Sequence, residues 1–186
     1  MNRLALAFAL SAALAPAAHA VEYTQVDAAR SNIHFNYKQM GVAMDGKFKK
    51  FTSQLSFDPA KPAAAKAAID VELASIDAGS SEANDEVAGK PWFNTKAFPT
   101  ARFVSTSVKP VGANRFEVAG TLTIKGKTQN VVVPASFTPQ GNAGVFDGLL
   151  TIRRGDFTIG EGPWAAFDIV ANDIQVKFRI AANTAR

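Results

Sequence analysis

Few side chains in this sequence belong to the types that carry out covalent chemistry. It contains no cysteine and two histidines, His19 and His34, and His19 lies in the leader segment described below. A Cys–His pair is therefore excluded, and a Ser-His-Asp triad would have to use His34. The G-x-S-x-G pattern of a nucleophile elbow is also absent. His34 falls on the polar face of a predicted strand, where an exposed or hydrogen-bonded histidine is more common than a catalytic one.

The acidic residues show no metal-ligand spacing. Metal sites are built from histidine, cysteine or clustered carboxylates, whereas Asp147, Asp156, Asp168 and Asp173 are spaced like ordinary turn or surface residues. The sequence has no glycine-rich phosphate-binding loop either. We therefore predict no catalytic residues, no metal site and no cofactor, and a protein that is not an enzyme. A hydrolase of lipid esters that depends on His34 is kept as an alternative.

The basic residues are mostly scattered among acidic ones. The formal net charge is +4, and a basic protein can bind nucleic acid or an anionic membrane. Lys47, Lys49 and Lys50 form the only compact basic cluster in the sequence. Such a cluster is more typical of a solvated strand end than of a phosphate site. We predict no nucleic-acid partner.

The first residues have the three parts of a secretory signal peptide. Arg3 supplies a positive charge, an apolar run extends from Leu4 to Leu14, and the small residues Ala18 and Ala20 match a cleavage site. The run is shorter than the roughly 20 residues that span a bilayer, so an uncleaved anchor is the less favoured alternative. We predict a signal peptide at 1–20 and a single exported domain at 21–186, with the net charge lowered from +4 to +3 by the loss of Arg3.

The stretch from Arg115 to Phe137 predicts a long antiparallel hairpin. Apolar and polar residues alternate from Phe116 to Lys125 with the period of a half-buried strand. Lys125-Gly126 then offers a tight turn, because glycine adopts positive φ without a Cβ clash. The returning strand is rich in β-branched residues, and Pro134 predicts that it is an edge strand or bulged there.

Similar alternation recurs along most of the chain. Further strands are expected at 22–27, 31–38, 41–50, 51–57, 68–77, 102–108, 144–152 and 167–180, with turns at 28–30 and at Asp45-Gly46. A helix is expected from Ser80 to Lys90, because Ser80 or Ser81 can cap its start while Gly89 and Pro91 end it. About eight or nine short strands with one or two short helices indicate an all-β antiparallel barrel or sandwich.

Aromatic residues are spread over nearly all of these strands. Fourteen phenylalanines could fill a solid core or line a long apolar pocket, and a closed barrel of about eight strands can hold either. Gly120 and Gly148 interrupt good strands, which is typical of barrel corners or of room left for a ligand. The loop with Trp92, Phe93 and Phe98 either plugs one end of the sheet or lines an entrance, and plugging is the preferred interpretation.

Several short motifs carry a resemblance to a known family. The most specific are GTLTIKG at 120–126 and RGDFTIG at 154–160. The others are SNIHF at 31–35, GKF at 46–48, LSFD at 55–58, VELASID at 71–77, WF at 92–93 and FPTARF at 98–103. In this order, over nearly the whole mature chain, these motifs resemble the YceI-like family.

The resemblance implies a lipocalin-like, extended antiparallel β-barrel in the bacterial periplasm that binds a polyisoprenoid or other long-chain lipid. Members are similar to domains encoded with or fused to b-type cytochromes of the inner membrane. An isoprenoid quinone is thus a candidate ligand and such a cytochrome a candidate partner, while the oligomeric state stays open, with a homodimer as one candidate. Two segments depart from the usual pattern, 85–88, where the family often has Asp followed by His-Leu, and 163–165.

Strand phase selects the residues that would face such a lipid. The expected wall consists of Phe35, Tyr37, Phe103, Leu122, Ile124, Phe146 and Leu150. The expected mouth consists of Trp92, Phe93, Phe98, Phe157 and Trp164. The predicted function is the burial of a long-chain lipid for transport, storage or sequestration. The alternative is a structural or stress-response domain with a packed core that acts through protein contacts.

Overall fold

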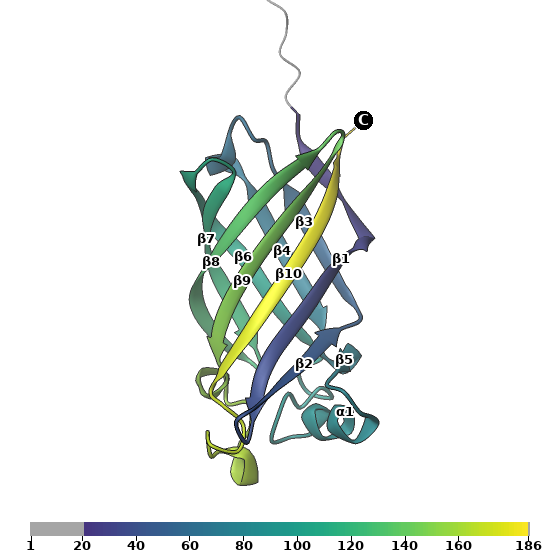
Figure 1. Ribbon diagram of the computed structural model, residues 1–186, viewed down its shortest axis with the longest axis vertical. Helices are drawn as coiled ribbons and strands as arrows, with labels where there is room; N and C mark the ends of the chain where they lie inside the picture. Colours follow the sequence, from purple (N-terminus) through teal and green to yellow (C-terminus); the bar gives the residue numbers. More distant parts are fainter. Residues whose placement is uncertain (1–20, 186) are drawn as a thin grey trace, which may run out of the picture.

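The computed structural model describes residues 21–185, so the predicted signal peptide at 1–20 lies outside the described residues. The described chain forms one curled antiparallel sheet of ten strands in the order β3-β4-β6-β7-β8-β9-β10-β1-β2-β5 (Figure 1). The strands are β1 (Tyr23–Gln39), β2 (Val42–Phe48), β3 (Phe51–Ser56), β4 (Lys66–Glu72), β5 (Ile76–Asp77), β6 (Thr100–Gly112), β7 (Arg115–Ile124), β8 (Lys127–Gln140), β9 (Ala143–Arg153) and β10 (Asp173–Thr184).

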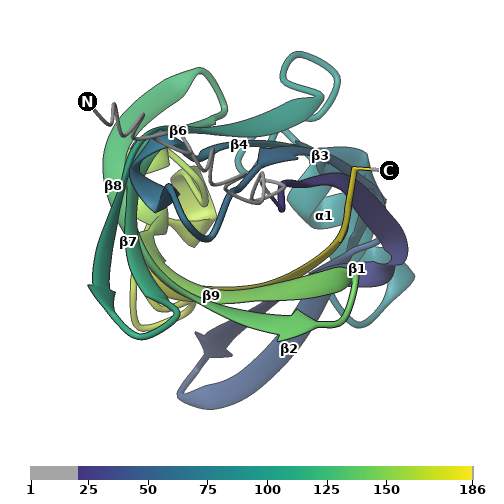
Figure 2. The same ribbon diagram turned by 90° about the horizontal axis from the view of Figure 1, so that it is seen from above.

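The sheet curls until its two sides meet, which produces the barrel seen end-on in Figure 2. Tyr23 of β1 forms an isolated bridge with Phe57, just after β3. The Tyr23 amide donates to the Phe57 carbonyl at 2.8 Å, and the Phe57 amide donates back at 3.2 Å. The predicted all-β antiparallel barrel is confirmed, with ten strands in place of about eight because short pieces such as β5 join the sheet.

The helical elements gather mostly at one end of the barrel. The α-helix α1 (Ser81–Ala88) lies there beside η3 (Arg154–Phe157) and η4 (Gly162–Trp164), whereas β10 ends at the opposite end (Figure 1). The Ser80 hydroxyl accepts from the Ala83 amide at 3.1 Å and caps α1 as predicted. The remaining short turns are η1 (Pro62–Ala64) and η2 (Leu73–Ser75). None of the helices among residues 21–185 is both long and apolar enough to cross a bilayer.

The central hairpin forms as its sequence predicts. Lys125 and Gly126 both have positive φ, 49° and 73°, as the favoured two-residue hairpin turn requires. The pairing of β8 with β9 begins at Ala135, so Pro134 lies where β8 is still an edge on that side. A proline is tolerated there because its missing N–H costs no ladder hydrogen bond.

Two predicted turns are wrong. The expected turn at 28–30 is a bulge inside the continuous strand β1, whose register with β10 shifts between Asp27 and Asn32. The expected turn at Asp45-Gly46 lies within β2, and the chain reverses earlier, at Met40-Gly41. Gly46 has a different role, because the Phe35 ring occupies the space that a Cβ at this position would need.

The glycines inside β7 and β9 also make room for aromatic rings. A Cβ at Gly120 would lie 2.5 Å from the Val104 carbonyl oxygen and 2.6 Å from the Phe103 ring. A Cβ at Gly148 would collide with the ring of Phe178, its direct partner in β10. Rings of the chain itself take the space beside both glycines, so it is not left for a ligand. Gly120 also pairs with Ser105 where the register of β6 with β7 shifts, which fits the corner role.

We expect Gly120→Ala to lower the free energy of unfolding by about 1–3 kcal/mol, because the new methyl group meets backbone that cannot move aside cheaply. The measurement is urea unfolding followed by circular dichroism. Glu117→Ala, at an exposed position of the same strand, is the control and should change the value by less than about 0.5 kcal/mol. Equal effects of the two substitutions would contradict the packing role of Gly120.

Candidate functional site

The lumen of the barrel contains an apolar cavity of about 580 Å³. This volume is within the range of about 300–1,000 Å³ that is usual for small-molecule sites. The inward side chains of most strands form its wall, for example Ile33, Val71, Val118 and Val176. Among the few polar groups on the lining, Glu82 and Glu86 of α1 are exposed and lie where the cavity approaches solvent.

All seven residues expected to form the wall line this cavity, namely Phe35, Tyr37, Phe103, Leu122, Ile124, Phe146 and Leu150. Burial raises the pKa of the Tyr37 hydroxyl. This side chain is neutral at physiological pH and adds a hydrogen-bond donor to a mostly apolar wall. That these residues contact a ligand stays a prediction.

Of the five residues expected to form the mouth, three line the cavity and two do not. Trp92, Phe93 and Trp164 line the cavity at the end where α1 lies. Phe157 is instead 2% exposed and packed in the core below the lumen, and the ring of Phe98 lies against the turn at Gly126. Neither Phe98 nor Phe157 is part of the cavity lining.

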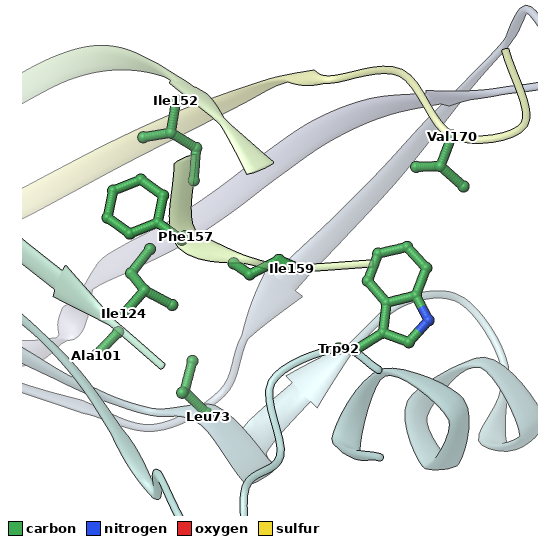
Figure 3. Close-up of a cluster of buried hydrophobic side chains, with 8 residues drawn as sticks. All are labelled: Leu73, Trp92, Ala101, Ile124, Ile152, Phe157, Ile159 and Val170. Atoms are coloured by element: carbon green, nitrogen blue, oxygen red, sulfur yellow. The ribbon is translucent and has the colours of Figure 1, made fainter. Parts of the chain in front are cut away.

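Two buried clusters close the ends of the lumen. The cluster at the α1 end is built from Leu73, Trp92, Ala101, Ile124, Ile152, Phe157, Ile159 and Val170 (Figure 3). In Figure 3, the ring of Phe157 lies between the side chains of Ile152 and Ile124. The cluster at the other end is aromatic and includes Tyr23, Phe57, Phe116 and Phe137. The cavity lies between the two clusters, and members of both contribute to its lining.

Arg154 holds together the chain that covers the α1 end. Its side chain is 1% exposed, and its guanidinium makes seven hydrogen bonds of 2.7–3.2 Å to six backbone carbonyl oxygens. These oxygens belong to Ile159, Gly160, Trp164, Ala166, Val170 and Ala171. Burial lowers the pKa of Arg154, but an arginine remains charged at neutral pH. One side chain thus fixes the whole segment from 159 to 171.

Lys125 joins this segment to the loop after α1. Its Nζ donates to the Lys90 carbonyl at 3.0 Å, to the Thr158 carbonyl at 2.8 Å and to Glu161 Oε2 at 2.7 Å. The side chain of Lys125 is 8% exposed, whereas that of its partner Glu161 is 56% exposed, so the ammonium is buried while the acidic partner reaches the surface. The hairpin turn between β7 and β8 is in this way anchored to both covering loops.

The two segments expected to depart from the family pattern, 85–88 and 163–165, contact each other directly. The Trp164 indole N–H donates to Glu86 Oε1 at 2.6 Å, which joins η4 to α1. The rings of Trp164 and Trp92 lie 5.6 Å apart, and all three side chains belong to the cavity lining. This contact places a polar link at the solvent side of the cavity.

His34 lies away from the lumen. It is exposed on the outer face of β1, where its direct cross-strand neighbours are Lys47 of β2 and Lys177 of β10. It is not part of the cavity lining. Within residues 21–185, no three histidine or acidic side chains come together in a group that could hold a metal ion.

A single curled antiparallel barrel that encloses an apolar lumen is the architecture of a lipocalin-like protein. The sequence profile of the YceI-like domain matches residues 24–182, and the chain belongs to the YceI-like family.

Similar proteins come from several bacteria. A UPF0312 protein of Pseudomonas putida is 34% identical over 183 residues, which cover 92% of this chain and 94% of the relative. The crystal structure of BcnA from Burkholderia cenocepacia superposes with a TM-score of 0.84 at 45% identity, covering 86% of this chain and 100% of that chain. A polyisoprenoid-binding domain from Saccharophagus degradans shares the fold with a TM-score of 0.69 at 15% identity, covering 89% and 99%.

The predicted site lacks several residues that line the cavity in the structure. Phe48, Ile69, Val176 and Phe178 line the cavity, and their inward phase in alternating strands would have been enough to include them. Arg154 was recognised only as part of a motif. Its structural role could not be predicted from residue types, because all its hydrogen-bond partners described above are backbone carbonyls.

We expect Arg154→Met to lower the free energy of unfolding by about 3 kcal/mol or more, because several buried carbonyls lose their donor at once. Arg179→Met is the matched control, since Arg179 pairs with Asp147 at the surface and its side chain is 55% exposed. The control should cost much less, because an ion pair this exposed to solvent is weak. Denaturant unfolding measures both values, and a cost at Arg154 as small as that at Arg179 would refute the structural role of the buried guanidinium.

Proposed function

We propose that the protein is a non-enzymatic carrier that buries the hydrocarbon chain of a polyisoprenoid, such as an isoprenoid quinone, in its lumen. The observation that carries this proposal is the apolar cavity of about 580 Å³ between the two end clusters. Protein interiors are normally packed to the density of organic crystals. A space of this size, lined by aromatic and branched aliphatic side chains, is suited to an apolar guest.

The hydrophobic effect can supply the affinity. Each buried CH2 group contributes about 0.8 kcal/mol, so two or three isoprene units contribute several kcal/mol before the cost of ordering the chain. The wall supplies aromatic rings such as Phe35, Phe103 and Phe146. Flat rings and branched side chains fit the methyl-branched, unsaturated chain of an isoprenoid.

The other functions are less well supported. A structural domain with a packed core would have no need of a cavity of this size. A lipid-ester hydrolase would need His34 beside the scissile bond, whereas His34 lies on the outer face of β1. Membership of the YceI-like family and the fold shared with a polyisoprenoid-binding domain are consistent with a lipid carrier.

The setting of this carrier is part of the proposal. The predicted signal peptide at 1–20 supports export, and the family resemblance favours the periplasm, where a protein that shields an apolar chain from water can move it between membranes or store it. A b-type cytochrome of the inner membrane remains a candidate partner if the cargo is a quinone.

Two neighbouring leucines test the lumen directly. Leu150 lines the cavity, whereas Leu149, the preceding residue of β9, is 42% exposed on the outside. We expect Leu150→Trp to abolish the uptake of radiolabelled geranylgeraniol, because the larger ring fills the cavity. Leu149→Trp should bind like the unmodified protein. Lipid retained after gel filtration measures both.

Circular dichroism establishes that both leucine variants fold. Leu122→Trp repeats the test from another strand, β7, since Leu122 also lines the cavity. Undiminished uptake by a folded Leu150→Trp and a folded Leu122→Trp would contradict binding in the lumen.

A further inference from the structure

Exposed apolar side chains gather at the α1 end of the barrel. Met40 and Val42, which are 77% and 61% exposed, are the two most exposed large apolar residues of the part of the chain that the structure describes. Phe167 is 50% exposed. We call these three residues the apolar tip. Water-exposed apolar side chains that lie together mark a surface that meets another apolar surface.

Two segments that are far apart in the sequence form the apolar tip. The Met40 amide donates to the Ile169 carbonyl at 2.8 Å, and the Ala171 amide donates to the Lys38 carbonyl at 2.9 Å. An antiparallel bridge between Gln39 and Val170 lies between these bonds. In Figure 1, the β1–β2 turn accordingly lies beside the segment around η4 at the lower end of the barrel. Phe167 is thus two residues from the bonded partner of Met40.

The apolar tip is held in a fixed shape. Met40 and Gly41 form a two-residue turn in which both φ angles are positive, 49° and 80°. The ring of Phe167 lies over the guanidinium of Arg154, whose Cζ is 4.9 Å from the ring centroid. Arg154 also fixes the backbone of this segment, as described above. A surface that is already ordered before binding loses little entropy when it binds.

The apolar tip adjoins the lumen. Gln39, the cross-strand partner of Val42, lines the cavity, and so do Val170 and Trp164 of the neighbouring segment. Glu82 and Glu86, which lie where the cavity approaches solvent, belong to the same end of the molecule. A body that touches the tip therefore lies next to the side of the cavity that approaches solvent.

The size and charge of the apolar tip favour a lipid bilayer as its partner. A stable protein interface buries at least about 1,000 Å² with complementary packing, and three side chains on two turns are too few for that. The nearest charged residues along the chain, Lys38 and Asp168, are exposed and of opposite sign, so the tip does not select for an anionic surface. A bilayer accepts apolar side chains in its interface without a matching partner surface.

We propose that the apolar tip docks the α1 end of the barrel on a lipid bilayer by inserting Met40, Val42 and Phe167 into the membrane interface. This statement goes beyond the proposed function and does not depend on what the lumen carries. If the cargo is a lipid, as proposed above, docking at this end places the lumen beside the membrane that supplies or receives it.

The test is flotation of the exported chain, 21–186, with vesicles of phosphatidylcholine alone. The variant Met40→Asp, Val42→Glu should lower the fraction bound at least about tenfold, because charged groups resist transfer out of water. The control Val111→Asp, Val132→Glu carries the same change in charge at two exposed valines elsewhere on the barrel and should bind like the unmodified chain. Circular dichroism establishes that both variants fold.

A fluorescent probe locates the contact. Val42→Trp should lose at least about half of its added fluorescence when the vesicles contain brominated phosphatidylcholine, because bromine quenches indole only at close range. Val132→Trp, which is 55% exposed as valine on β8, should not respond. The signal of the unmodified chain, with Trp92 and Trp164, is subtracted from both.

Several results would overturn the docking surface. These are no flotation of the unmodified chain, equal flotation of the two double variants, or quenching at position 132 as strong as at position 42. Binding that requires phosphatidylglycerol and disappears in salt would assign the contact to surface lysines. A dimer that is lost on Met40→Asp, Val42→Glu, without vesicle binding, would assign the tip to a second copy of the chain.

The lumen is tested separately on the same proteins. Met40 and Val42 are not part of the cavity lining, so the variant Met40→Asp, Val42→Glu should retain geranylgeraniol after gel filtration as the unmodified chain does. An unmodified chain that floats with vesicles but retains no geranylgeraniol would contradict the proposed function and leave the docking surface supported.

Discussion

The buried guanidinium of Arg154 is the constraint on which the closed end of this barrel depends. The segment from 159 to 171 contains little regular structure, so its backbone carbonyls have few partners of their own. Arg154, the first residue of η3 and the one after β9, satisfies six of them from a single position. Burying a charge in this way is costly unless all its donors are bonded, and here carbonyl dipoles replace the solvent.

The same arrangement positions the side chains that cover the α1 end of the lumen. Because the segment after Arg154 is fixed, Trp164 can lie against Trp92 and Glu86, and Ile159 can join the core below the cavity. Lys125 adds a second link between this segment and the loop after α1. The interior remains hollow because rings such as Phe103 and Phe178 lie over glycines of neighbouring strands and not across the barrel axis.

Much of this architecture could be predicted from the sequence, because strand alternation determines which side chains point inward. The seven wall residues were identified by phase alone, and all of them line the cavity. Phe98 and Phe157 were misplaced because they lie outside strands, where no periodicity indicates a direction. Gly46 was mistaken for a turn residue because the ring that requires it, Phe35, belongs to another strand. The position of Met40 beside the segment that carries Phe167 depends on how the chain folds at this end of the barrel, which residue types do not encode.

Native mass spectrometry of the protein purified from the cells that make it tests the central claim most directly. The intact protein would be weighed, then denatured, and the released lipid identified by its mass. The account predicts one prenyl-chain molecule per barrel. A protein that consistently carries no lipid, although the same preparation retains the lipids of other carriers, would contradict the view that the lumen is a lipid-binding site.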